Sequence, residues 1–125
     1  MRSKFALRFW FGLALGLLLA ACSGAASPAA SAQNVSLTTI DAFTFTPNTI
    51  TGKVGQPIHV SLVNNDNGLV HSFVVDELSV KLENVQPKTT GELTFTPTTA
   101  GTYVFYCDTP GHKAAGMTGT VVVSP

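Results

Sequence analysis

From residue 35 onward the chain is a succession of short runs rich in β-branched and aromatic residues, separated by Gly, Pro, Asn and Asp. Such runs suit a pleated, half-buried surface, and the residues between them favour turns. No long helical periodicity occurs, and only residues 76–85 could hold a short helical turn or an irregular crossover. Seven or eight short strands predict an all-β, antiparallel Greek-key β-sandwich or barrel. We expect strands over 35–40, 43–46, 57–62, 69–75, 92–95, 102–107 and 118–123.

The N-terminal segment has a different composition. Three basic residues precede an apolar run over 9–21, which is shorter than the about 20 residues that a membrane-spanning helix needs. A positive head followed by a short apolar core is the pattern of a secretory signal. The run ends in Leu19-Ala20-Ala21-Cys22, which resembles the lipobox of bacterial lipoproteins. Residues 1–21 are therefore predicted to be a lipoprotein signal peptide, with Cys22 as the lipidated new N-terminus. An ordinary secretory signal with a chance cysteine is the alternative.

The residues after Cys22 divide into a tether and a domain. Residues 23–33 are mostly small and without periodicity, so they cannot bury a face. We expect residues 22–33 to form a lipidated, flexible tether and residues 34–125 to form one small domain. The protein would then be exported and lipid-anchored to the extracytoplasmic face of a bacterial membrane.

Charge and cysteine content narrow the possible functions of this domain. Residues 34–125 contain four lysines and seven acidic residues, a net charge of about −3. Nucleic-acid binding would call for a basic stripe, so we expect no nucleic-acid partner. Cys107 is the one cysteine in this range, although an export route leads to compartments where disulfides form. Metal ligation is the readiest explanation for an unpaired thiol there.

The candidate metal ligands are concentrated between residues 103 and 117. Alternation places Tyr103, Phe105 and Cys107 on the inward face of a strand, with the thiol at the point where a loop begins. His112 and Met117 follow in a Cys-x4-His-x4-Met spacing. Thiolate, imidazole and thioether form a soft, mixed donor set that suits copper, whereas thioether is a poor ligand for zinc.

A trigonal copper site with two histidines and one cysteine needs a second imidazole. His71 supplies it, because it follows the turn-forming cluster 64–68 and begins an apolar run. We expect His71, Cys107 and His112 to lie in a plane with copper, and Met117 to be a long axial ligand.

Each of these residues taken singly has an ordinary explanation. A lone cysteine is commonly a small buried hydrophobe, a lone methionine fills a core, and a lone histidine is commonly structural. Only their joint spacing favours a metal site. His59 serves as a contrast, because it alternates against its apolar neighbours and is expected on the surface.

The segment 103–117 resembles the copper loop of the cupredoxins, the blue copper electron carriers that include plastocyanin, azurin and auracyanin. The resemblance extends over the folded domain, from Phe45-Thr46-Pro47 through Gly55 and Asn65 to the loop, whose length is similar to that of azurin and auracyanin. It implies one copper ion, cycling between Cu(I) and Cu(II), on His71, Cys107, His112 and Met117. Two positions depart from commoner members: Ser72 after the first histidine and Asp108 after the cysteine. Both bear on hydrogen bonding around the ligands and hence on the redox potential.

The resemblance implies a type 1 copper electron carrier rather than an enzyme. It would exchange electrons transiently with membrane-associated redox partners, such as a cytochrome or a membrane electron-transfer complex. Two residues are expected to form the electron-transfer surface. His112 lies amid small and apolar residues, and Tyr106 matches the docking tyrosine of plastocyanin. A copper storage or delivery module, a copper enzyme and a metal-free adhesion-type sandwich are the alternatives.

Overall fold

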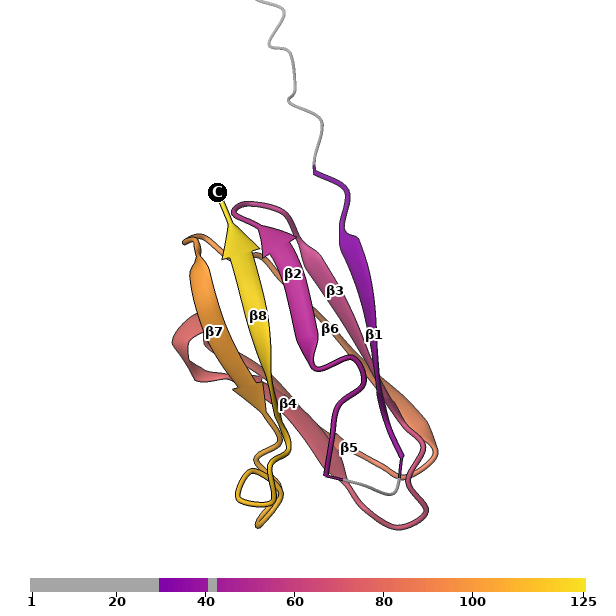
Figure 1. The fold of residues 1–125 in the computed structure, drawn as a ribbon. Coiled ribbons are helices and arrows are strands. Elements are labelled where there is room, and N and C mark those ends of the chain that lie inside the picture. Colours follow the sequence, from indigo (N-terminus) through magenta and orange to yellow (C-terminus); the bar gives the residue numbers. More distant parts are fainter. Residues whose placement is uncertain (1–29, 41–42) are drawn as a thin grey trace, which may run out of the picture.

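The computed structural model describes residues 30–40 and 43–125 (Figure 1). The predicted signal peptide and Cys22 lie outside this part, so lipid attachment stays a prediction. No helix within the described residues is long and apolar enough to cross a bilayer. The elements are β1 Gln33–Thr39, β2 Thr49–Lys53, β3 Ile58–Asn64, β4 His71–Val75, the 3₁₀ helix η1 Asp76–Leu78, β5 Val80–Val85, β6 Thr89–Phe95, β7 Gly101–Tyr106 and β8 Thr118–Ser124.

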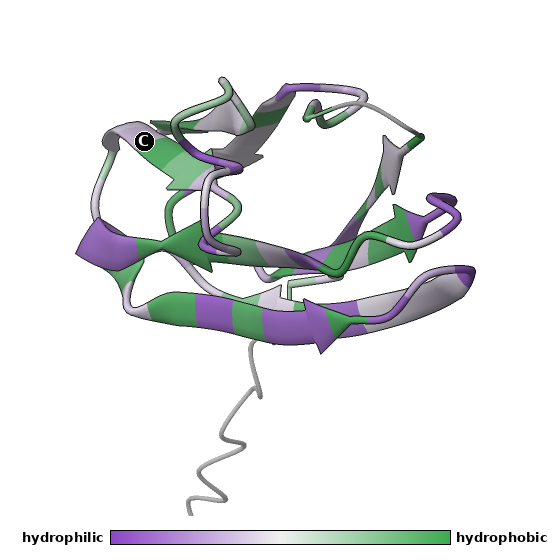
Figure 2. Ribbon diagram, turned by 90° about the horizontal axis from the view of Figure 1, so that it is seen from below, coloured by the Kyte–Doolittle hydropathy of each residue, from purple (hydrophilic) through white to green (hydrophobic). Residues whose placement is uncertain are grey.

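The strands pair into a three-stranded sheet, β1-β3-β6, and a five-stranded sheet, β2-β8-β7-β4-β5. The two sheets enclose a common interior, which is seen end-on in Figure 2. The predicted all-β sandwich is therefore confirmed. Wholly antiparallel pairing is wrong, because β1 runs parallel to β3 and β2 runs parallel to β8. Parallel neighbours require a crossover connection. The chain passes through the other sheet between β1 and β3, and it does so again between β2 and β8.

The alternation of side chains along each strand determines which residues form the interior. In β3 every second residue from Ile58 is buried. Hydrophobic and hydrophilic residues also alternate in bands along strands in Figure 2. β4 differs, because all five of its residues are buried. Phe105 of β7 lies deep in the core, with its ring centroid 5.1 Å from that of Phe45 and 5.0 Å from that of Phe73. These three rings pack where β7 approaches the loop that follows it.

Two expected elements differ in the structure, and one strand was not expected. Residues 43–46 form no strand, and only a single bridge joins Thr46 to Thr38, since Pro47 has no N–H to extend the pairing. Strand β2 was not expected, because its glycine lowers the local strand preference. Pairing with β8 stabilises the strand despite that weak preference. The region 76–85 contains the expected helical turn, η1, but continues as strand β5 along β4.

The connections that matter for function lie at one end of the sandwich. The β7–β8 loop, the β3–β4 loop and the β1–β2 connection are all at the end opposite the C-terminus (Figure 1). The predicted ligands come from this end: His71 begins β4, and the other three lie between the end of β7 and the start of β8. The fold thus brings together residues 36 positions apart in the sequence.

Candidate metal centre

Three of the predicted ligands meet in space. The donor atoms of His71, Cys107 and His112 all lie within 4.8 Å of one another. Cys107 Sγ is 3.4 Å from His112 Nδ1 and 3.9 Å from His71 Nδ1. Metal bonds of about 2.0–2.3 Å, arranged at about 120°, would set such atoms roughly 3.7 Å apart. The distances therefore fit a single metal ion between the three donors, and the role of these residues as ligands stays a prediction.

Burial closes the site to solvent. His71, Cys107 and Met117 have no exposed surface, and His112 retains 6%. Burial lowers the pKa of His112, with a smaller contribution from the neighbouring His71. A lowered pKa favours the neutral imidazole, which keeps a lone pair available for a metal. Imidazole nitrogens, a thiolate and a thioether are donors that suit copper in both of its common oxidation states.

Met117 lies in the same core cluster as Cys107. Backbone hydrogen bonds place it: the Cys107 N–H donates to the Met117 carbonyl at 3.1 Å, and the Met117 N–H donates to the His112 carbonyl at 3.0 Å. The thioether is thereby held on the inner side of the loop. Its axial role stays a prediction.

The loop between β7 and β8 is a series of tight turns. Gly111 and Gly116 adopt positive φ angles of 86° and 97°, which L side chains rarely adopt. The N–H of His112 donates to the Thr109 carbonyl at 3.0 Å. The Thr109 hydroxyl also donates to the Val70 carbonyl at 3.1 Å, next to His71. The two ligand-bearing loops are therefore fastened directly to each other.

Asn64 fixes the loop that carries His71. The side chain is fully buried, and its amide donates to the carbonyls of Leu69 and Val85 at 2.8 and 2.9 Å. Its oxygen accepts the Asp66 N–H at 3.0 Å. One amide thus ties the end of β3, the loop and the end of β5 together. From the sequence alone, Asn64 was expected only as part of a turn-forming cluster.

Asp66 is a site residue that sequence analysis missed. It is fully buried, and its Oδ2 contacts Nε2 of His71, the ring nitrogen remote from Cys107. An aspartate in a cluster of Asn and Gly is typical of a solvated turn, so the sequence carried no specific signal for this contact.

Ser72 and Asp108, the two departures from the family pattern, contact each other. The Ser72 hydroxyl lies 2.5 Å from Asp108 Oδ1 and 3.5 Å from Cys107 Sγ, and it accepts the Asp108 N–H at 2.8 Å. A hydroxyl has one proton, so the nearer carboxylate competes with the thiolate for it. Lys81 lies 3.0 Å from Asp108 Oδ2. The Ser72 hydrogen bond, aided by Lys81, lowers the pKa of Asp108, although partial burial opposes the shift.

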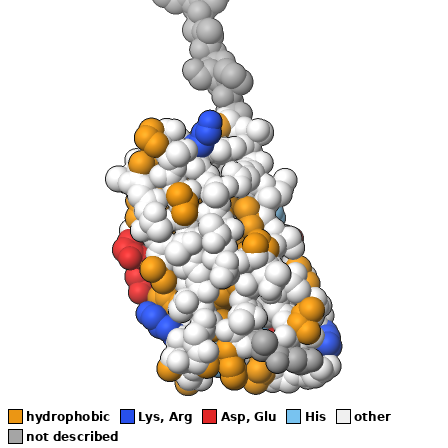
Figure 3. Space-filling model, viewed as in Figure 1, with side chains coloured by type: hydrophobic (Ala, Val, Ile, Leu, Met, Phe, Trp, Pro, Cys, Tyr) orange, Lys and Arg blue, Asp and Glu red, His pale blue; other side chains and the backbone are white. Residues whose placement is uncertain are grey.

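His112 lies beneath a surface of small and apolar residues. The ring of Phe43, from the β1–β2 connection, has its centroid 4.8 Å from that of His112. The neighbours Pro110, Gly111, Ala114 and Ala115 are exposed. Hydrophobic side chains gather at this end of the molecule in Figure 3. The expected surroundings of His112 are present, and their use in docking stays a prediction.

The Tyr106 side chain contacts charged neighbours rather than lying free on the surface. Its hydroxyl donates to both carboxylate oxygens of Asp76, at 3.0 and 2.9 Å, and this hydrogen bond raises the pKa of Tyr106. The ammonium of Lys113 lies 3.5 Å from its ring centroid, a cation–π contact. A basic and an acidic side chain therefore flank the second predicted surface point.

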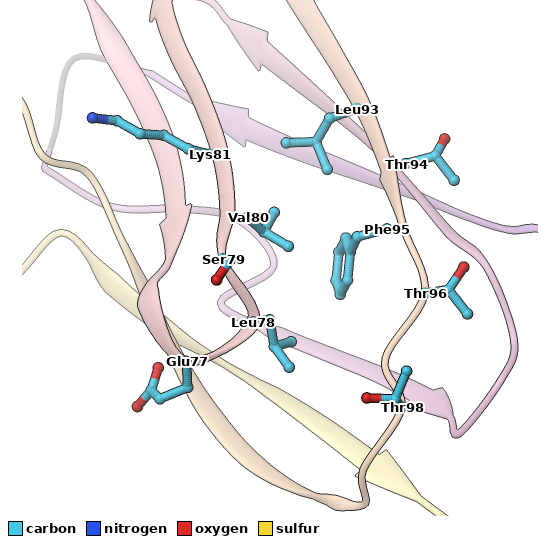
Figure 4. Close-up of a pocket in the computed structure, with 10 residues that line it drawn as sticks. All are labelled: Glu77, Leu78, Ser79, Val80, Lys81, Leu93, Thr94, Phe95, Thr96 and Thr98. Atoms are coloured by element: carbon cyan, nitrogen blue, oxygen red, sulfur yellow. The ribbon is translucent and has the colours of Figure 1, made fainter.

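A separate hollow of about 520 Å³ lies between η1–β5 and the segment 93–98 (Figure 4). Leu78, Val80, Leu93 and Phe95 point into it, and Glu77 and Lys81 point away. These inward side chains belong to the core or pack against it. The hollow therefore continues the hydrophobic interior at the gap between the sheets and adds no polar group to the metal centre. His59 lies on the far sheet, half-buried, with Nδ1 2.9 Å from the Thr94 hydroxyl, away from the three ligands.

Comparison with known proteins agrees with this geometry. The sequence model of a family described as the cupredoxin-like domain matches residues 12–123. Rusticyanin of Acidithiobacillus ferrooxidans is 31% identical over 87 residues, which cover 55% of this chain and 56% of rusticyanin. The chain thus matches only about half the length of this curated relative.

Two solved structures share the fold. Auracyanin from the photosynthetic bacterium Roseiflexus castenholzii is similar with a TM-score of 0.69 and 25% identity, covering 77% of this chain and 99% of that one. Auracyanin A, a "blue" copper protein from Chloroflexus aurantiacus, has a TM-score of 0.69 and 20% identity, covering 75% of this chain and 100% of that one. At 20% identity the likeness speaks for the fold alone.

Proposed function

Because the chain belongs to the cupredoxin-like family, we propose that it is a type 1 copper protein that carries single electrons. The observation that carries the proposal is the buried His71–Cys107–His112 group, whose donor atoms are spaced for one ion. When bound, copper would supply a one-electron Cu(II)/Cu(I) couple. Auracyanin from Roseiflexus castenholzii, 25% identical to this chain, is known in a dithionite-reduced form, and this supports a redox-active centre here.

The protein's own residues would set the geometry of that centre. Cys107 would donate a thiolate, and His71 and His112 would each donate Nδ1, the ring nitrogen nearer the sulfur. Met117 would supply a weak axial thioether from the inner side of the loop. The surrounding burial excludes water from the ligands, and this favours electron exchange over reaction with solvent.

Copper storage or delivery is less well supported by the site. Delivery requires ligands that an acceptor can reach, whereas three of the four predicted ligands have no exposed surface. Only the edge of His112 approaches solvent, beneath exposed Pro110, Ala114 and Ala115. An edge of this kind suits electron transfer across a small, transient apolar contact. We expect a redox protein, such as a cytochrome or a membrane electron-transfer complex, to dock there.

Export and lipid anchoring belong to the same proposal. They rest on the apolar run and on Leu19-Ala20-Ala21-Cys22, with a tether of small residues before the domain. Mass spectrometry of the membrane fraction would test it: we expect a chain that begins at a lipid-modified Cys22. A Cys22→Ser variant should lose the lipid mass. Retention of residues 1–21 in the mature chain would contradict the anchor.

Copper loading tests the central claim. The full chain, purified in mild detergent and loaded with Cu(II), should absorb intensely in the visible range and show narrow copper hyperfine splitting. Cys107→Ser should abolish the colour, because it removes the thiolate. Met117→Leu should keep the colour and change the reduction potential. His71→Gln should lose the spectrum, whereas the matched His59→Gln, altered on the far sheet, should keep it. A colourless wild-type protein would refute the proposal.

A further inference from the structure

We propose that Asp66 is a positioning residue that presents Nδ1 of His71 to the metal and biases bound copper toward Cu(II). The inference rests on the proposed copper site. It concerns a carboxylate that donates nothing to the metal itself, and its effect reaches the ion only through the ring of His71.

The contact between the two residues is built into the fold. Asp66 and His71 are both fully buried, and Asp66 Oδ2 contacts His71 Nε2. The Asp66 backbone is fastened in turn, because its N–H donates to the Asn64 side chain at 3.0 Å. The described residues show no ion pair of Asp66 with a lysine or arginine. The exposed Lys88, on a neighbouring turn, donates to the Asn65 carbonyl instead.

This contact selects one tautomer of His71. A carboxylate oxygen can only accept, so the ring must carry its proton on Nε2. Nδ1 then keeps its lone pair, and it is the nitrogen 3.9 Å from Cys107 Sγ. A histidine ligand whose second nitrogen donates to a carboxylate is both oriented and made more basic. The ring is therefore ready to bind through Nδ1 and cannot turn without losing the hydrogen bond.

The second oxygen of Asp66 leaves the contact with His71 as the main polar interaction of this carboxylate. Oδ1 is buried and has no hydrogen-bond partner among the described residues. A proton placed on it would be a buried donor with no acceptor, which is costly. With Nδ1 on the metal, the His71 Nε2–H is the donor that faces the carboxylate.

The charge of the complete site then depends on the oxidation state of copper. Cu(II), one thiolate and one carboxylate sum to zero, whereas Cu(I) leaves a net charge of −1. A buried net charge is disfavoured because little solvent is present to screen it. Asp66 should therefore favour the oxidised ion. Replacing a group of this kind typically changes metal affinity by 10–100-fold. A change of about tenfold in the Cu(II)/Cu(I) affinity ratio corresponds to about 59 mV for a one-electron couple.

The decisive variant is Asp66→Asn in the full, copper-loaded chain. The amide keeps the size of the side chain and an oxygen that can accept the Nε2–H, but it removes the charge. We expect the blue spectrum to persist and the reduction potential, measured by voltammetry, to rise by about 59 mV or more. The control is Glu92→Gln, which removes one negative charge on the far sheet, where Glu92 accepts from the Ser61 hydroxyl at 3.3 Å. It should leave the potential close to that of the wild type.

Nitrogen-15 NMR of the wild-type Cu(I) protein provides a second readout that needs no variant. We expect His71 to be protonated at Nε2, with slow exchange of that proton with solvent. An Nδ1-protonated His71 would overturn the proposal, as would an Asp66→Asn potential that moves no further than that of Glu92→Gln. If Asp66→Asn fails to fold, the NMR result alone decides. Failure of the proposed function has a different signature, because the wild type would then show no blue spectrum.

Discussion

Among the glycines of the described residues, Gly119 in β8 leaves the least room for an added side chain. A Cβ added there would lie 2.2 Å from Cζ of Phe105 and 2.5 Å from the carbonyl oxygen of Asn48. Ordinary van der Waals contact begins at 3.4 Å, so each separation would have to grow by about 1 Å. We therefore predict that Gly119→Ala strongly destabilises the domain.

The surroundings give the magnitude of this destabilisation. Phe105 cannot retreat easily, because its ring packs against Phe45 and Phe73 at centroid distances of 5.1 and 5.0 Å. The Asn48 carbonyl is also held, since it accepts the Thr120 N–H at 2.9 Å. Overpacking in a core costs about 1–3 kcal/mol, and two rigid neighbours place this case at about 3 kcal/mol. For a domain of this size, the midpoint of thermal unfolding should fall by at least about 12 °C.

Urea and thermal unfolding, followed by circular dichroism, would measure the effect. Gly68→Ala is the matched control, because a Cβ at Gly68 meets nothing within 4 Å and its φ is not in the left-handed region. We expect that control to change stability by no more than about 0.5 kcal/mol. The double variant Gly119→Ala, Phe105→Leu should lose less stability than the sum of the two single variants, because leucine leaves room for the added methyl group. Equal stability of Gly119→Ala and Gly68→Ala would refute the packing argument.

Three further changes probe the neighbourhood of the ligands. Ser72→Ala should lower the free energy of unfolding in urea by about 1–3 kcal/mol, since the Asp108 N–H and Oδ1 lose the Ser72 hydroxyl, whereas Ser61→Ala on the far sheet should lower it by less than about 1 kcal/mol. Asn64→Ala should lower the free energy of unfolding by about 2 kcal/mol, because the buried Val85 carbonyl and the part-buried Leu69 carbonyl lose their donor. Ala114→Lys, on the exposed surface by His112, should slow electron self-exchange measured by NMR without changing the potential; an unchanged rate would exclude that surface.

The parts of the site that could be predicted from sequence are those whose chemistry is local. Cys107, His112 and Met117 fall within one loop, and the alternation of β7 correctly placed Phe105 and Cys107 on the buried face. A loop of fixed length constrains its own ligands, so spacing alone carried the prediction. His71 required one further inference, that a turn followed by an apolar run returns to the same end of the sandwich.

The parts that could not be predicted depend on tertiary packing. Ser72 reaches Asp108 because β4 lies beside β7 in the five-stranded sheet, with Val74 opposite Tyr106. Asp66 is only five residues from His71, but its contact depends on how the buried Asn64 side chain holds the loop. No local pattern encodes that neighbourhood. The same holds for β2, whose pairing with β8 overrides a weak strand preference. Hydrogen bonding around the ligands tunes a metal site, and it is the feature of this site that the sequence predicts least well.

These contacts support the proposed electron transfer. Each predicted ligand is fixed by bonds that do not involve the metal: Met117 and Cys107 by backbone pairing, His112 by its N–H to the Thr109 carbonyl, and His71 by Asp66. The two loops are joined through the Thr109 hydroxyl. A change in the charge of a bound ion would therefore cause little movement of the protein. A preorganised site of this kind exchanges electrons with a small reorganisation energy. The same restraints hold the His112 edge at a fixed depth below the surface, so a partner would meet one donor geometry in both oxidation states.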